Sequence, residues 1–256
     1  MTISKEKKGF FGVREGLSYV ACTAFVLVCA AIVGFFSENL TQGILTENIL
    51  DVNSSAPQSG ERVIILDPGH GGIDSGAVGL NGALEKELNL DIALDLRDML
   101  VFNGYKVVMT RTDDTMYYDE NVSLSRKAQD TRRRVNMTKQ YDDCIFVSIH
   151  LNKFVSEKYS GLQVYYSSNT KESFDIAKSI QTHARELLQK DNDRKMKKSN
   201  ATIYVLDKAV VPAVLVECGF LSNAAENERL CDKEYRRDIA TVLFMSLDSY
   251  LSSQSS

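Results

Sequence analysis

Between residues 62 and 252, short runs of apolar residues alternate with longer segments in which apolar residues recur every three or four positions, and few folds accommodate this alternation. The apolar runs predict buried strands at 63–66, 106–109, 144–149, 162–166 and 214–216. The periodic segments predict helices at 87–103, 123–140, 173–190 and 233–251. Because continuous apolar strands are typical of parallel sheets, we predict a single α/β domain. Its mostly parallel central sheet of about six strands is covered by helices on both faces.

The N-terminal region carries a long uncharged apolar run at residues 16–36. At about 1.5 Å per helical residue, this run can cross a hydrocarbon core of roughly 30 Å. Basic residues precede the run, which favours a cytoplasmic N-terminus and an extracytoplasmic remainder. We expect an uncleaved transmembrane helix before the domain; a cleaved signal peptide, whose apolar region is normally shorter, is the alternative. The chain then divides into a cytoplasmic N-terminus (1–15), an anchor (16–37), a polar linker (38–61) and the globular domain (62–252).

Charge and cysteine content exclude two classes of protein. The net charge of −4 does not provide the basic surface that nucleic-acid binding requires. The five cysteines are odd in number and form no Cys-x-x-Cys pair, which argues against a disulfide scaffold and against a thiolate zinc site.

Polar residues follow three of the predicted strands at the point where each strand ends. His70 follows the first strand within a glycine-rich run, His150 follows the strand at 144–149, and Glu217 follows the strand at 214–216. In open α/β sheets, ligands bind at the carboxyl ends of the strands. A polar side chain at the end of a buried strand is costly without a partner, and a shared metal ion would supply one.

The two histidines and a nearby carboxylate match the ligands of a catalytic zinc site, which takes three nitrogen or oxygen ligands and keeps a fourth position for water. Glu85, which begins the helix behind the first strand, is the third ligand by placement. Glu87 is a competing carboxylate, although its position near the helix N-terminus also suits the helix dipole. Glu217 would then accept a proton from a water that the metal acidifies.

Simpler interpretations apply to other residues of these types. A single histidine after a strand is more often structural than metal-binding, so the metal hypothesis depends on two of them. His183 lies mid-helix among polar residues and is predicted to be a solvated surface residue. The run 69–72 lacks the spacing and the lysine of a phosphate loop, so we attribute its glycines to close approach of a substrate. No nucleophile-elbow pattern surrounds Ser148, which argues against a serine hydrolase.

Several blocks occur in order along nearly the whole domain, from Val63 to Leu251: LDPGHGGIDSGA (66–77), LEKE (84–87), TR (110–111), SIHLN (148–152) and PAVLVECGFLSN (212–223). In these blocks the chain resembles the zinc-dependent N-acetylmuramoyl-L-alanine amidases. The resemblance implies hydrolysis of the amide that joins N-acetylmuramic acid to the L-alanine of peptidoglycan stem peptides.

The resemblance also implies the site residues and the cofactor. Zinc (Zn2+) would be the cofactor, and Glu85 rather than Glu87 would complete its ligand set of His70, Glu85 and His150. Glu217 would be the catalytic acid and base. Asn152 and Arg134 are implied as substrate-binding residues.

Segments 123–130 and 156–161 and the N-terminal anchor are similar to the sporulation and germination amidases of endospore-forming bacteria. Those enzymes remove stem peptides during formation of the muramic-δ-lactam of spore cortex. The similarity implies peptidoglycan as the substrate. It also implies a membrane-anchored protein whose catalytic domain lies outside the cytoplasm, in the intermembrane space of the forespore, or a secreted protein if the N-terminus is cleaved.

Division amidases of this family carry an inserted helix that blocks the zinc, and the segment between His150 and Glu217 has no room for one. We therefore expect that a protein partner, such as a sporulation lipoprotein, activates the enzyme. A basic run in the helix at 123–140 motivates a surface for the partner or the wall, although exposed charges usually signify little. This run comprises Arg126, Lys127, Arg132, Arg133, Arg134 and Lys139.

Two other functions remain open from the residues alone. A zinc peptidase acting on the stem peptide would release shortened peptides rather than an intact stem peptide. A non-catalytic wall-binding protein would bind peptidoglycan without releasing product, although the full ligand set and Glu217 argue against it.

Overall fold

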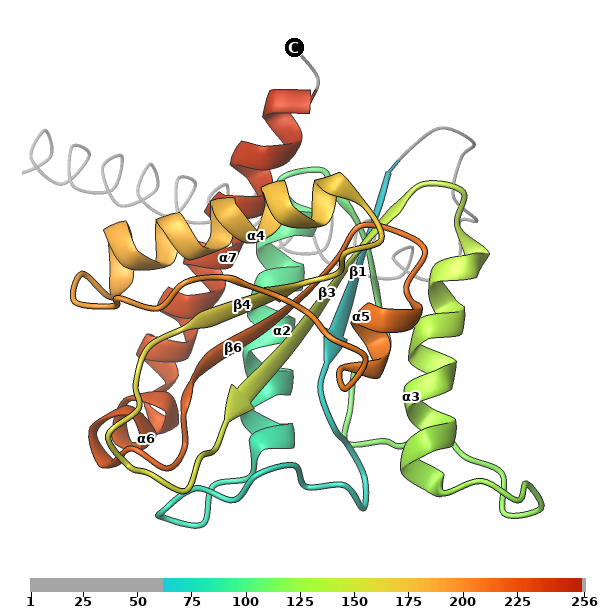
Figure 1. Cartoon of the computed structure of the whole chain (residues 1–256), viewed down its shortest axis with the longest axis horizontal. Coiled ribbons are helices and arrows are strands. Elements are labelled where there is room, and N and C mark those ends of the chain that lie inside the picture. The colour runs from blue at the N-terminus through green and yellow to red at the C-terminus, as the bar shows by residue number, and fades with distance from the viewer. Residues whose placement is uncertain (1–61, 255–256) are drawn as a thin grey trace, which may run out of the picture. The chain divides into compact units, whose positions relative to one another are not determined.

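The structure is a computed structural model that describes residues 62–254. Its centre is a six-stranded sheet in the order β2-β1-β3-β6-β4-β5 (Figure 1). The strands are β1 (Val63–Pro68), β2 (Lys106–Met109), β3 (Cys144–Asn152), β4 (Gln163–Tyr166), β5 (Lys197–Lys198) and β6 (Ala213–Phe220). The helices are α2 (Glu85–Phe102), α3 (Arg126–Met137), α4 (Lys171–His183), α5 (Tyr204–Lys208), α6 (Ala224–Cys231) and α7 (Lys233–Gln254).

The sheet is mixed but mostly parallel, as predicted. Strands β1, β2, β3 and β6 are parallel to one another, whereas β4 is antiparallel to β6 and β5 is parallel to β4. The carboxyl ends of β1, β3 and β6 therefore meet at one edge. This arrangement confirms that the strands that carry His70, His150 and Glu217 are neighbours.

Helices cover both faces of the sheet because alternate strand residues point to opposite sides. The larger core joins α2, α4 and α7 to residues such as Ile64, Val147 and Val216. The smaller core joins α3 and α5 to residues such as Ile65, Phe146 and Leu215. In Figure 1, α2 and α7 pass behind the sheet and α5 lies in front of it.

Three elements were not predicted, namely β5, α5 and α6. Lys197 and Lys198 of β5 are exposed and polar, so no apolar run marks this edge strand. Two predicted helices are shorter than expected and continue in other helical forms. The helix at 123–140 ends in a 3-10 turn at Thr138–Gln140, and the helix at 173–190 ends in a π-helical turn at Ala184–Leu188.

The prediction that a transmembrane helix precedes the domain is corrected. Among residues 62–254, no helix is both long enough and apolar enough to cross a membrane. The longest helices there, α2 and α7, bury one side and expose charged residues on the other. The segment 16–37 that the prediction concerned lies outside the described residues, as do 1–15 and 38–61.

Candidate metal centre and active site

His70 lies in the tight loop that follows β1. Its backbone has φ 63°, a left-handed conformation that is uncommon for residues other than glycine and is often found at functional sites. Its Nδ1 lies 2.9 Å from Oδ2 of Asp74, within the same loop. The carboxylate of Asp74 thereby orients the ring, and the second ring nitrogen, Nε2, faces Glu85 at 3.3 Å.

Glu85 is the first residue of α2, and backbone groups hold its carboxylate in place. Oε2 accepts a hydrogen bond from the N–H of Ala77 at 2.8 Å, and Oε1 accepts one from the N–H of Leu151 at 3.0 Å. The Asn89 side chain, one turn along α2, donates to Oε1 at 3.3 Å. The carboxylate is therefore fixed between the loop that leads from β1 to α2 and the end of β3.

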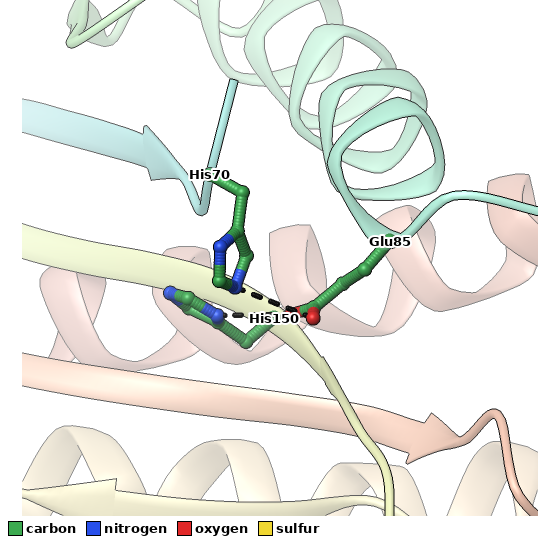
Figure 2. Close-up of side chains that lie close together, drawn as sticks. All are labelled: His70, Glu85 and His150. Atoms are coloured by element: carbon green, nitrogen blue, oxygen red, sulfur yellow. Dashed lines mark hydrogen bonds and ion pairs between the residues drawn. The ribbon is translucent and has the colours of Figure 1, made fainter. Parts of the chain in front are cut away.

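His150 completes the cluster from β3. Its Nδ1 lies 3.0 Å from Oε1 of Glu85, and its ring is 5.0 Å from the His70 ring, centroid to centroid. Figure 2 shows the three side chains converging from separate elements. One nitrogen or oxygen of each residue lies within 4.8 Å of the others, so the three could hold one metal ion. Two imidazoles and a carboxylate also form a donor set that catalytic zinc sites use.

The charges of the cluster are strongly coupled. Burial alone would lower the pKa of His70, but the hydrogen bonds to Asp74 and Glu85 raise it to about 9. Burial acts to raise the pKa of Glu85, yet the two histidines hold it well below its usual range. A buried carboxylate that stays ionised needs cationic partners, and a metal cation at this position would serve the same purpose.

Glu217 lies within β6, where it pairs in register with His150 of β3. The prediction placed both residues after their strands, but β3 and β6 extend far enough to include them. Oε2 of Glu217 is buried without a hydrogen-bond partner among the described residues. Burial raises the pKa of Glu217 to about 7, although the charge of His150 opposes the shift. A buried carboxylate without a partner is costly, which indicates a ligand or a reacting group at this position.

Gly69 and Gly76 make room for the cluster itself, while the predicted close approach of a substrate to the glycines of the run 69–72 stays a prediction. A Cβ atom on Gly69 would lie 2.3 Å from the His150 ring. A Cβ atom on Gly76, whose φ is +65°, would lie 2.6 Å from Oε2 of Glu85. Side chains at these two positions would therefore displace the metal-binding residues.

Arg134 of α3 is buried beneath the His70 loop rather than presented to a substrate. Its Nη1 donates to Oδ1 of Asp67 at 2.8 Å, and its Nε donates to Oδ2 of Asp130 at 2.7 Å. It also donates to the carbonyl oxygens of Pro68 and His70, both at 2.7 Å. These contacts give Arg134 a positioning role for the loop in place of the predicted substrate contact.

Replacing Arg134 with glutamine is expected to lower the free energy of unfolding by about 3 kcal/mol, because Asp67 would stay buried with an unpaired charge. Urea denaturation measures this change. Arg132→Gln is the matched control, since Arg132 is exposed two residues earlier, and it should change stability by less than about 0.5 kcal/mol. Equal stability of the two variants would contradict the role of the pair.

The other predicted residues lie apart from the cluster or have separate partners. Glu87 is exposed, and His183 is bonded to Ser179 of its own helix. Asn152 is half-buried at the end of β3, and its side chain makes no hydrogen bond to the described residues, so its substrate role stays a prediction. The Ser148 hydroxyl donates to Asp67 at 2.6 Å, which gives it a structural partner.

The basic run of α3 does not form one exposed surface. Arg134 is buried, Lys127 pairs with Asp74 at 3.0 Å, and Arg126 pairs with Glu120 at 2.6 Å. Arg133 donates to the carbonyl oxygen of Thr110. These basic residues therefore have separate contacts, although they all carry the same charge along the helix.

Two residues that support the site received no role from the sequence. Asp74 orients His70, and Arg111 donates to the carbonyl oxygens of Pro68, Gly69 and Lys86. Both residues lie in the sequence blocks that carry the family resemblance, which is the signal that could have identified them.

Known proteins are similar to this chain in sequence and in fold. Residues 64–248 match the family model of the N-acetylmuramoyl-L-alanine amidases. The germination-specific N-acetylmuramoyl-L-alanine amidase of Bacillus subtilis is 38% identical over 198 residues, which cover 77% of this chain and 82% of that protein. The amidase AmiA of Escherichia coli is 29% identical over 261 residues, covering 82% of this chain and 86% of that protein. The solved structure of the CwlD amidase from Clostridioides difficile, in complex with the GerS lipoprotein, superimposes on this structure with a TM-score of 0.70. The two sequences are 36% identical, and the match covers 75% of this chain and 98% of the CwlD chain.

Proposed function

The chain belongs to the N-acetylmuramoyl-L-alanine amidases. From this premise we propose how its site catalyses the amidase reaction and in which biological process the enzyme acts. The enzyme hydrolyses the amide that joins N-acetylmuramic acid to the L-alanine of peptidoglycan stem peptides. The observation that supports the assignment of the site is the convergence of His70, Glu85 and His150 beside Glu217, whose buried Oε2 has no hydrogen-bond partner among the described residues.

His70, Glu85 and His150 would hold zinc, with Asp74 orienting the His70 ring from behind. A carboxylate on the second ring nitrogen of a ligating histidine is a common feature of zinc sites. Zinc, when bound, supplies a Lewis acid that polarises the amide carbonyl and acidifies water. The buried loop contacts of Arg134 and Arg111 keep His70 in its left-handed conformation.

Glu217 is proposed as the group that moves the proton. Its carboxylate accepts a proton from water as the water oxygen attacks the carbonyl carbon of the scissile amide. It then donates that proton to the amide nitrogen as the C–N bond breaks. The products are a free lactyl carboxylate on muramic acid and the amino group of L-alanine on an intact stem peptide.

The biological setting proposed is the maturation of spore cortex, where removal of the stem peptide precedes formation of muramic-δ-lactam. The resemblance to the germination-specific relative supports this setting. Because peptidoglycan lies outside the cytoplasmic membrane, the catalytic domain would act outside the cytoplasm. A deletion strain whose cortex retains its δ-lactam would contradict the setting.

A protein partner that limits or supports activity is the third part of the proposal. The CwlD structure contains the GerS lipoprotein, and its similarity to this chain supports a partner of the same kind. Copurification from sporulating cells, with the tagged protein as bait, tests for such a partner.

The reaction is tested by product analysis on purified peptidoglycan fragments with added zinc. Mass spectrometry should show intact stem peptides beginning with L-alanine and glycan with a free lactyl carboxylate. Shortened peptides would instead identify a zinc peptidase. Binding of the fragments without any product, even after extract of sporulating cells is added to supply a partner, would identify a non-catalytic wall-binding protein.

A further inference from the structure

The flank of the site beyond Glu217 is formed by β4 and by the segment that leads into β5. Glu217 pairs with Gln163 of β4, and β4 in turn pairs with β5. Because β4 and β5 run opposite to β6, their first residues lie at the edge where β6 ends. Arg194, three residues before β5, therefore lies at the active-site edge, about two strand spacings from Glu217.

Arg194 is held in place by neutral groups. Its Nη1 donates to Oε1 of Gln163 at 3.1 Å, and its Nε donates to the carbonyl oxygen of Ser160 at 2.5 Å. Its guanidinium carbon lies 4.3 Å from the centre of the Phe220 ring, a cation–π contact. The guanidinium plane is therefore oriented before any ligand arrives.

The guanidinium lies on the same side of the sheet as the Glu217 carboxylate. Gln163 and Glu217 are register partners, so both side chains project from one face. The Tyr165 hydroxyl shares that face and lies 3.4 Å from Oε1 of Gln163. Burial raises the pKa of Tyr165, the charge of Glu217 raises this pKa further, and the charge of Arg194 lowers it.

The positive charge of Arg194 is not paired within residues 62–254. Arg134 and Arg236 each form an ion pair with an aspartate, whereas no carboxylate of the described residues lies within ion-pair distance of Arg194. The nearby Glu226 uses its two oxygens to accept backbone N–H groups of Gly161 and Phe220. The Nη2 group of Arg194 makes no hydrogen bond to the described residues. Exposed Lys195, Lys197 and Lys198 add charge of the same sign.

We propose that Arg194 forms a subsite for a free carboxylate of the stem peptide, on the leaving-group side of the scissile amide. The inference rests on the proposed function, because the amidase reaction places the stem peptide next to Glu217. Stem peptides carry free carboxylates, and the planar fork of arginine binds a carboxylate through two parallel hydrogen bonds. A span of about 10 Å between Glu217 and Arg194 corresponds to about three residues of extended peptide. The carboxylate therefore belongs to one of the first three residues.

The test compares two muramoyl-tripeptides that differ only in their carboxylates, which are free in one and converted to carboxamides in the other. The zinc-loaded wild-type protein should cleave the free acid with a kcat/KM about ten-fold higher, mainly through a lower KM. Arg194→Gln should abolish this preference by lowering kcat/KM for the free acid about ten-fold, to the value for the carboxamide. Arg194→Lys keeps the positive charge but lacks the planar guanidinium. It should therefore retain part of the preference for the free acid.

Arg237→Gln is the matched control, because Arg237 is exposed on α7, whose core packing lies on the opposite face of the sheet. It should cleave both substrates as the wild type does. Equal kcat/KM values of the wild type for the two substrates would overturn the proposed subsite. An equal decrease of kcat/KM for both substrates in Arg194→Gln would overturn it as well. If the wild type cleaves neither substrate, both alone and with added extract of sporulating cells to supply a partner, the proposed function fails. Calorimetric binding of the free acidic tripeptide to wild type and Arg194→Gln then decides the subsite independently, and equal affinities would refute it.

Discussion

Replacing Glu217 with glutamine is expected to lower the amidase kcat by about 10³-fold, because an amide can neither accept the proton of water nor return it to the leaving amine. The exchange preserves the shape of the side chain. Oε2 of Glu217 has no hydrogen-bond partner among the described residues, so the substitution disrupts no observed contact of that atom. We therefore expect unchanged zinc content and unchanged or increased stability. Steady-state kinetics on muramoyl-peptides and elemental analysis measure these properties.

Glu87→Gln provides the control for this variant. Glu87 is the carboxylate that competed with Glu85 in the sequence, and it is exposed at the start of α2, so the same chemical change there should leave kcat within about two-fold. If Glu217→Gln retained wild-type turnover, another group would have to move the proton. A matching loss in Glu87→Gln would show that the effect does not depend on the position of Glu217.

Replacing His150 with alanine is expected to abolish stoichiometric zinc binding and, with it, turnover. The variant removes one of three converging ligand atoms and, with it, the 3.0 Å contact between His150 and Glu85. His70→Ala should have the same result, because the cluster would again lose a nitrogen ligand. Elemental analysis after dialysis measures the metal, and circular dichroism verifies that the variants remain folded.

His183→Ala serves as the control for the loss of a histidine. His183 bonds to Ser179 within α4 and contributes no ligand atom to the cluster. It should retain both zinc and activity. Chelator treatment of the wild type should mimic His150→Ala, and added zinc should restore the chelated wild type but not the variant. Full zinc occupancy in His150→Ala would refute the assignment of the ligands.

The main strands and helices could be predicted because burial imposes a period on the sequence. The runs at 106–109 and 144–149 predicted β2 and most of β3, since both strands lie in the covered sheet. Strand β5 could not be predicted, because its two exposed lysines pair with β4 through backbone groups alone. Backbone pairing at an edge leaves no apolar pattern in the side chains.

The sequence by itself determined that His70, His150 and Glu217 belong near the carboxyl ends of three strands and that the chain resembles one family of amidases. Both conclusions depend on the order and type of residues along the chain. Only the resemblance distinguished Glu85 from Glu87, and the structure then placed Glu85 against both histidines. Helical position could not separate two carboxylates only two residues apart.

Only the tertiary structure decided which polar residues are buried and what they contact. Arg134 meets Asp67 across 67 positions, and Arg194 meets Gln163 across 31. Both are arginines in polar segments, yet Arg134 is buried under the His70 loop, whereas Arg194 lies beside the site and has no ion-pair partner in the part of the chain that the structure describes. The physical reason is that burial and pairing of a charge depend on residues that folding brings together, which a local sequence pattern does not record.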